Sequence, residues 1–348
     1  MKRGFAFLVV VIMTAACPLT AQLIEAGAPQ APAQAPLTEK EVVALLKSKQ
    51  PVAQIVAVVE QRGVNFEISP AIEKTLRKAK ADDRFIEVVR NAGPNARAAR
   101  AANPNAPRLS QEEGRDIWAL ANELDADRAI QMMNDFVQKY PNSVALTDAY
   151  AAGAVAYARK DQYAQAIEYG EKSLKANPDN LRALLLLAPL LPQPQMLKGA
   201  DLDKEKKLAD AEAYAKRAVE LVKTIPKLSN ETDQQFEKRK EDYTAQMHSA
   251  LGMVHLQRAG MGLQGLDRDE LARAEQEYQT AISTALQPTP QDYYRLGEVR
   301  TMLERYDAAI EAFTKAAELG QGTLIKTYAD QKIEELNKRK AKAPPAKQ

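Results

Sequence analysis

One spacing of small and large residues recurs between residues 110 and 340, and it restricts the fold more than any other feature of the sequence. Its best copy consists of Tyr293, Leu296, Gly297, Arg300, Ala309, Phe313 and Ala316. Apolar residues three and four positions apart predict helices, and no alternation of Val and Ile indicates a sheet. Alanine or glycine on the contact face lets antiparallel helices approach more closely than the usual distance of about 8–10 Å. One such hairpin cannot bury this face alone, so the copies are expected to stack.

Four further copies precede the best one. The clearest copy consists of Tyr150, Gly153, Ala154, Tyr157, Ala166, Gly170, Ser173 and Pro178. Two copies are stretched between their halves, one with Leu184, Leu187, Ala188, Leu191, Ala211 and Ala218, and the other with His248, Leu251, Gly252, His255, Ala274 and Tyr278. The first copy is irregular, as expected of a terminal unit, and consists of Ile117, Leu120, Ala121, Leu124, Ala129, Met133, Phe136 and Pro141.

The pattern resembles the tetratricopeptide repeat, in which an aromatic residue, Leu-Gly and Tyr mark the first helix, and Ala, Phe and Pro follow. The resemblance spans residues 110–340 and implies an all-α fold, a right-handed superhelix of antiparallel helix pairs (α-solenoid) with about five copies. Residues 324–340 resemble the solvating helix that closes such arrays. The resemblance restricts the fold far more than the function.

The first 21 residues are typical of a secretory signal peptide. Lys2 and Arg3 precede an apolar run over residues 5–13, and small residues lead to Ala21. Cleavage after Ala21 would remove Cys17, the only cysteine, and would leave 46 basic against 46 acidic residues. This balance argues against a nucleic-acid partner, and the apolar run is too short for a permanent membrane span. The alternative is that Cys17 carries the lipid anchor of a bacterial lipoprotein.

The sequence predicts two linkers around a small helical module. Residues 22–37 are rich in Ala, Pro and Gln, and residues 92–109 form a second segment of similar kind. Between them, residues 38–91 form a duplicated helical hairpin, since Leu45, Ile55 and Val58 recur 31 positions later as Leu76, Ile86 and Val89. Residues 341–348 form a basic tail, which we expect to be a solvated helix end.

No pattern predicts chemistry strongly. His248 and His255 occupy signature positions of one repeat, so packing explains their spacing, and a metal or acid/base pair is the alternative. Gly260, Gly262 and Gly265 fit G-x-G-x-x-G, but they follow a helix and not a strand, which favours a flexible turn over a nucleotide site. We expect no catalytic residues, no cofactor and no metal.

In arrays of this family the first helix of each pair lines a concave groove. Stepping through the copies predicts a mostly apolar groove lined by Ala151, Val155, Ala158, Leu185, Ser249, Met253, Leu256, Tyr294 and Glu298. Such a groove would suit a peptide or amphipathic helix, whereas plain packing is the competing explanation for the same residues. The insertions at 192–207 and 260–269 both join first to second helices and predict a second surface on one edge.

These features together predict an exported, non-enzymatic scaffold, periplasmic or secreted, that binds protein partners. Two alternatives stay open. One is a lipid-anchored envelope assembly subunit, which depends on Cys17. The other is a small-ligand or nucleotide-binding enzyme that uses the segment Gly260–Gly265 and His248.

Overall fold

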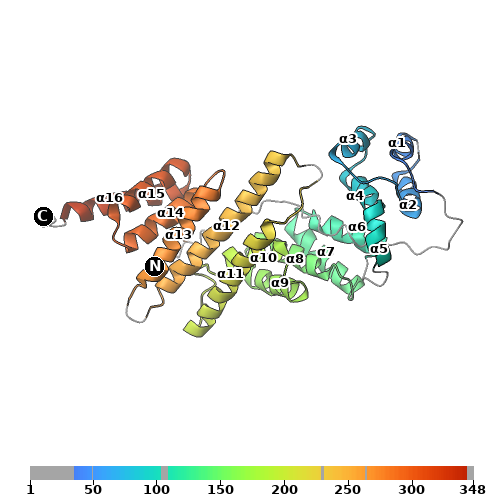
Figure 1. Ribbon diagram of the computed structural model, residues 1–348. Coiled ribbons are helices and arrows are strands. Elements are labelled where there is room, and N and C mark those ends of the chain that lie inside the picture. Colours follow the sequence, from blue (N-terminus) through green and yellow to red (C-terminus); the bar gives the residue numbers. More distant parts are fainter. Residues whose placement is uncertain (1–34, 49, 103–108, 229–230, 263–264, 343–348) are drawn as a thin grey trace. The chain divides into compact units, whose positions relative to one another are not determined.

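The structure, a computed structural model, describes residues 35–48, 50–102, 109–228, 231–262 and 265–342 (Figure 1). Within these ranges every regular element is a helix, and an isolated β-bridge joins Leu37 to Val64. The all-α prediction is therefore confirmed. The chain divides into two compact units, which are described separately. The first unit contains the described residues up to Ala176 together with the segment 227–232, and the second unit contains the rest.

The first unit contains nine of the described helices: α1 (Glu39–Lys47), α2 (Val52–Arg62), α3 (Pro70–Lys78), α4 (Asp83–Asn91), α5 (Pro94–Ala102), α6 (Gln111–Ala121), α7 (Ala126–Lys139), α8 (Leu146–Arg159) and α9 (Tyr163–Ala176). The second unit contains seven: α10 (Leu181–Leu190), α11 (Asp201–Val222), α12 (Asp233–Ala259), α13 (Arg268–Thr284), α14 (Pro290–Met302), α15 (Tyr306–Leu319) and α16 (Leu324–Lys342).

Helices α1 to α4 form the predicted module, and its duplication is visible in the packing. The corresponding helices of the two hairpins contact each other, α1 with α3 and α2 with α4. Thr38 and Glu41 make a reciprocal capping box at α1, and the Ser69 hydroxyl accepts from the Ile72 amide at α3. Ile55 and Ile86, which are related by the duplication, are both buried.

Both predicted linkers contain residues that belong to the module. Leu37 is buried, its amide donates to the Gly63 carbonyl at 2.8 Å, and its carbonyl accepts from the Asn65 amide at 2.9 Å. The second linker differs from the prediction more clearly, because residues 94–102 form α5. The first turn of α5 is held by Glu67, whose carboxylate accepts from the Asn95 amide at 2.6 Å.

Arg97 fixes α5 to the connection between the two hairpins of the module. Its Nη2 donates to the Val64 carbonyl at 2.9 Å, and a Cβ on Gly63 would lie 3.1 Å from the Arg97 side chain. We therefore expect Arg97→Ala to lower the local stability of the module by about 1–2 kcal/mol, because a charged donor and its packing are lost. Hydrogen exchange should show reduced protection in α2 and α5. Arg84→Ala, at an exposed position of the same module, should leave both helices unchanged.

Helices of the repeat region pair as the spacing predicts, α6 with α7 and α8 with α9 in the first unit, and α10 with α11, α12 with α13 and α14 with α15 in the second. Close approach occurs at the predicted small residues. A Cβ on Gly252 would lie 2.9 Å from the Tyr278 ring, and one on Gly297 would lie 2.7 Å from the Phe313 ring. The last helix, α16, packs on α15 and buries Ala329 and Leu336.

Candidate functional site

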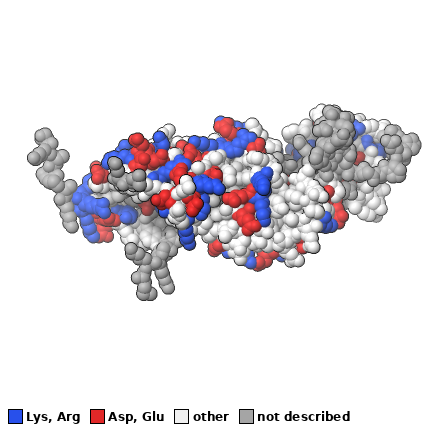
Figure 2. All heavy atoms as spheres, turned by 90° about the horizontal axis from the view of Figure 1, so that it is seen from below, with Lys and Arg blue, Asp and Glu red and all other residues white. Residues whose placement is uncertain are grey.

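On the face that Figure 2 shows, Lys and Arg side chains lie beside Asp and Glu side chains. Several ion pairs of the described residues lie within one helix, such as Lys238 with Asp242 and Lys326 with Asp330, each at 2.6 Å. Pairs at this spacing stabilise exposed helices modestly, so these charges serve the helices that carry them.

The residues predicted to line a groove fall into two groups. Val155, on α8 in the first unit, is half-buried, whereas Ala151 and Ala158 on the same helix are buried. Because Val155 belongs to the other unit, it is considered apart from the rest. In the second unit, the half-buried members are Leu185 on α10, Ser249 on α12, and Tyr294 and Glu298 on α14. We call these four residues the first-helix face.

Met253 and Leu256 do not line an open groove, and for them the prediction is wrong. Both are buried, with 7% and 9% of their surfaces exposed. They belong to one core cluster with Ala259, Leu271, Ala274, Tyr278, Leu296, Val299, Leu303 and Ala312. The following pair, α14 and α15, contributes to this cluster, so the stacking of repeats covers positions that a single repeat would leave open.

The first-helix face is held together by polar contacts that step from one first helix to the next. Gln246 of α12 donates to the Leu185 carbonyl of α10 at 3.4 Å, and Ser249 donates to Asp292 of α14 at 2.5 Å. Arg295 donates to Glu298 at 2.7 Å. The face is therefore more polar than predicted.

Tyr294 joins this face to the core beneath it. Its ring makes an edge-on contact with Phe313, with ring centroids 5.3 Å apart. Burial, with Glu298 nearby, raises the pKa of the Tyr294 phenol to about 12. This ring therefore presents a neutral hydroxyl on a fixed aromatic side chain, a combination that is common at protein interfaces.

Tyr278 carries a fully buried hydroxyl that makes no hydrogen bond to any described residue. Burial raises the pKa of this phenol. Since an unpaired buried hydroxyl costs about 1–3 kcal/mol, we expect Tyr278→Phe to raise the melting temperature of the second unit by about 2–4 °C per kcal/mol regained. Scanning calorimetry measures the shift. A lower melting temperature would show that the hydroxyl has a stabilising partner.

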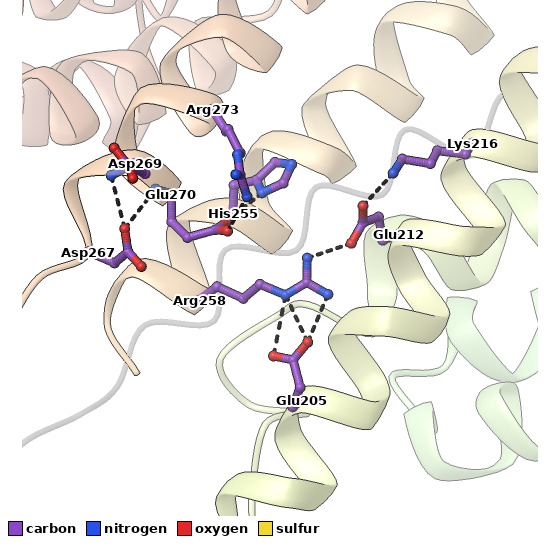
Figure 3. Close-up of polar contacts among 9 residues, drawn as sticks. All are labelled: Glu205, Glu212, Lys216, His255, Arg258, Asp267, Asp269, Glu270 and Arg273. Carbon is purple, nitrogen blue, oxygen red and sulfur yellow. Dashed lines mark hydrogen bonds and ion pairs between the residues drawn. The ribbon is translucent and has the colours of Figure 1, made fainter. Parts of the chain in front are cut away.

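Arg258 links the helices that flank the two insertions (Figure 3). Arg258, at the end of α12, donates to Glu205 and to Glu212 of α11, with nitrogen–oxygen distances of 2.9 and 2.5 Å. Partial burial alone would raise the pKa of Glu212, but hydrogen bonds from Lys216 and Arg258 outweigh it and lower the pKa to about 2. Both carboxylates bind the Arg258 guanidinium, so these charges are explained by the contact between α11 and α12.

The described glycines of the glycine-rich segment follow α12 directly: Gly260 lies in the turn after this helix, and the Gly265 amide donates to the Gly262 carbonyl at 3.4 Å. A Cβ on Gly262 would lie 2.4 Å from the Gly265 carbonyl oxygen, so glycine is required there. A phosphate would need the free amides at the start of α13. Those amides already donate to the Asp267 carboxylate, from Asp269 at 2.9 Å and from Glu270 at 3.1 Å (Figure 3). This arrangement favours the turn over the nucleotide site.

Both histidines are used to join α12 to α13. His248 shares a hydrogen bond of 2.6 Å with Glu277, and His255 shares one of 2.6 Å with Glu270, which also pairs with Arg273. Within the described ranges, no three His, Cys, Asp or Glu side chains come together in a way that could hold a metal ion. The two histidines lie seven residues apart, so they form two hydrogen bonds along the contact between α12 and α13.

Sequence reasoning missed Asp292, which lies beside the first-helix face. It is buried, and its carboxylate accepts hydrogen bonds from Ser249 and Thr289. The segment Thr289-Pro290-Gln291-Asp292 has the form of a helix start, and this local signal was available. The partner Ser249 lies 43 residues earlier and carries no such signal.

No described helix combines the length and the apolar character that crossing a membrane requires. The predicted signal peptide at 1–21, the lipid site at Cys17, most of the linker at 22–37 and the basic tail from residue 343 onward lie outside the described residues.

No protein-family model and no curated protein matches the sequence. Among solved structures, the chain is similar to a thermophilic tetratricopeptide repeat (TPR) protein of Thermus thermophilus, at 17% identity over 64% of this chain and 99% of that one, with a TM-score of 0.41. It is also similar to a TPR protein of Parabacteroides merdae, at 13% identity over 86% of this chain and 98% of that one, with a TM-score of 0.31. A third similar structure is yeast Tom70, at 12% identity over 94% of this chain and 70% of that one, with a TM-score of 0.32. At these values, the assignment of the fold rests on the helix pairs and buried small residues of the chain itself.

Proposed function

We propose that this helical repeat chain, whose helix pairs resemble those of TPR proteins, is an exported, non-enzymatic scaffold that binds a peptide or helix of a partner protein on the first-helix face. The supporting observation is that Leu185, Ser249, Tyr294 and Glu298 stay half-exposed on three successive first helices, and that Tyr294 packs against the buried cluster that contains Phe313. This surface combines an aliphatic side chain, an aromatic ring and polar groups. Because the side chains are already fixed, a partner can bind with little loss of side-chain freedom.

Site-specific photo-cross-linking tests this proposal. A benzophenone amino acid at position 185 or 294 should give the same discrete cross-linked partner, identified by peptide mass spectrometry from the native cell fraction. The matched control is position 311, which is exposed on the second helix α15. Cross-links of equal yield and composition from all three positions would contradict binding at the first-helix face.

Export is proposed from the sequence, where a charged start, an apolar run and small residues precede Ala21. The mass of the mature N-terminus distinguishes the two forms of this proposal. A chain that begins at Gln22 supports plain cleavage, whereas a chain that begins with an acylated Cys17 supports the lipid-anchored envelope subunit. An uncleaved Met1 in cells would contradict export by this route.

The enzyme alternative depends on the segment Gly260–Gly265, and the Asp267 cap argues against it. A thermal-shift screen with nucleotides and divalent metals measures the difference. We expect no shift. A rise in the melting temperature that grows with ligand concentration would support the alternative.

A further inference from the structure

Asp292 is a buried acid placed between two successive helix pairs. It is the third residue of α14, after the cap Thr289 and Pro290, and 8% of its surface is exposed. Ser249 Oγ of α12 donates to Asp292 Oδ1 at 2.5 Å, and Thr289 Oγ1 donates to Oδ2 at 2.7 Å. The Asp292 carboxyl group therefore links the pair α12–α13 to the start of α14.

The carboxyl group lacks a cationic partner among the described residues, since only Ser249 and Thr289 bond to its oxygens. Charged and titratable groups on the surrounding helices are engaged elsewhere or buried in neutral form. They are His248 of α12 with Glu277 of α13, Tyr278 of α13, Arg295 with Glu298 on α14, Lys315 with Glu318 on α15, and Glu335 with Lys332 and Arg339 on α16. A negative charge on Asp292 would thus be buried with no cation beside it, and its hydroxyl donors and the dipole of α14 offset this cost only in part.

We propose that the Asp292 carboxyl group joins the pairs α12–α13 and α14–α15 through a contact that is more stable at low pH. We call this contact the joint. In its neutral form, the unprotonated oxygen accepts from one hydroxyl and the protonated oxygen donates to the other, so both contacts are kept without burying a charge. When it is ionised, both hydroxyls donate to it, but the contact carries a desolvation cost and the joint loosens. Since Ser249 of the first-helix face is itself a partner of Asp292, the joint acts on this face, and it is independent of whether a partner protein binds there.

The sign of the effect follows from the pKa. Burial raises the pKa of the Asp292 carboxyl above its ordinary value of 3.8, and the hydrogen bonds from Ser249 and Thr289 offset this only in part. The folded chain therefore keeps this proton to a higher pH than the unfolded chain does. The contribution of Asp292 to the stability of the folded state is greatest near and below pH 3.8, and it falls as the pH rises through the folded pKa.

Asp292→Asn tests the joint, because the amide keeps the shape and an acceptor but cannot ionise. We expect a melting temperature about 2–4 °C above that of the native chain near pH 8, and a difference that shrinks toward zero as the pH approaches about 4. Subtracting the native chain at each pH removes the effect of other acids, such as Glu212, whose low pKa makes them lose stability in acid. Hydrogen exchange at each pH should place the gain in α12 and α14.

Asp203→Asn is the matched control, since Asp203 is also the third residue of its helix, α11, but is exposed. We expect this variant to be slightly less stable than the native chain near pH 8, because it loses only a favourable interaction with the helix dipole. Ser249→Ala should reduce the protection of α12 and α14 and should leave α8 and α9, in the other unit, unchanged. The joint is ruled out if the Asp292→Asn difference is the same at every pH, or if the gain in protection lies outside α12 and α14.

Discussion

Met253→Glu is expected to lower the stability of the second unit by about 3–5 kcal/mol, because it places an unpaired charge in a closed core. Met253 is 7% exposed, and its sulfur accepts from Gln257 at 3.4 Å within the same helix. No described cation lies in the core cluster that surrounds it. Circular dichroism should show a transition at a lower temperature, and hydrogen exchange should place the loss of protection in α12, α13 and α14.

Leu185→Glu is the comparison that separates core from surface. Leu185 is half-buried on the neighbouring first helix α10, so its new carboxylate can reach water and the loss should be about 1 kcal/mol or less. If a partner binds the first-helix face, this variant should lose binding while it keeps its fold. Equal destabilisation by the two substitutions would contradict the division of the predicted groove residues into these groups.

Gly297→Val is expected to destabilise the pair α14–α15 by about 3 kcal/mol. A Cβ at this position would lie 2.7 Å from the Phe313 ring, which is fully buried and cannot move aside. The helices would have to separate, and the T-shaped contact between Tyr294 and Phe313 would be lost. Calorimetry and hydrogen exchange in α14 and α15 would measure the change.

Gly153, one position before the residue that corresponds to Gly297 in its repeat, provides a comparison. A Cβ on Gly153 would lie 2.0 Å from the sulfur of Met133 and only 3.0 Å from its Cγ. Methionine is flexible and can take another rotamer, so Gly153→Ala should cost less than Gly297→Ala. Combining Gly297→Ala with Phe313→Leu should recover part of the loss. The absence of any recovery would show that the ring is not the obstacle.

The repeat fold could be predicted from sequence because its cause is local. Close approach at Gly252 and Gly297 requires a small residue in one helix and a ring in the next, and each recurs at its own signature position although the connection between the two helices varies in length. That both insertions join a first helix to a second helix was predictable from sequence, but the Arg258 link was not. Its carboxylate partner Glu205 lies 53 residues earlier, in the insertion at 192–207, and no local signal joins the two residues.

Two errors have one cause, which is that burial depends on distant parts of the chain. Composition predicted a linker where α5 forms, because the residue that anchors α5, Arg97, bonds to Val64, 33 positions away. Register within one repeat placed Met253 and Leu256 on an open face, but the next pair closes over them. Local rules are enough for the caps Thr38 and Ser69, because each hydroxyl accepts from an amide three residues later.

Residues 63–65 connect the two hairpins of the N-terminal module, and the hydrogen bonds around them determine how the module would respond to mechanical tension. Leu37, at its beginning, is bonded to Gly63 and Asn65, and Ala92, at its end, accepts from Val64 at 2.9 Å. We call these three backbone hydrogen bonds, from Leu37 to Gly63, from Asn65 to Leu37 and from Val64 to Ala92, the clasp. A force applied between residues 37 and 92 therefore acts on the clasp before it reaches the helices. A chain held at its N-terminus and loaded through its repeats would open at the clasp first, and the buried core of α1 to α4 would come under load only afterwards.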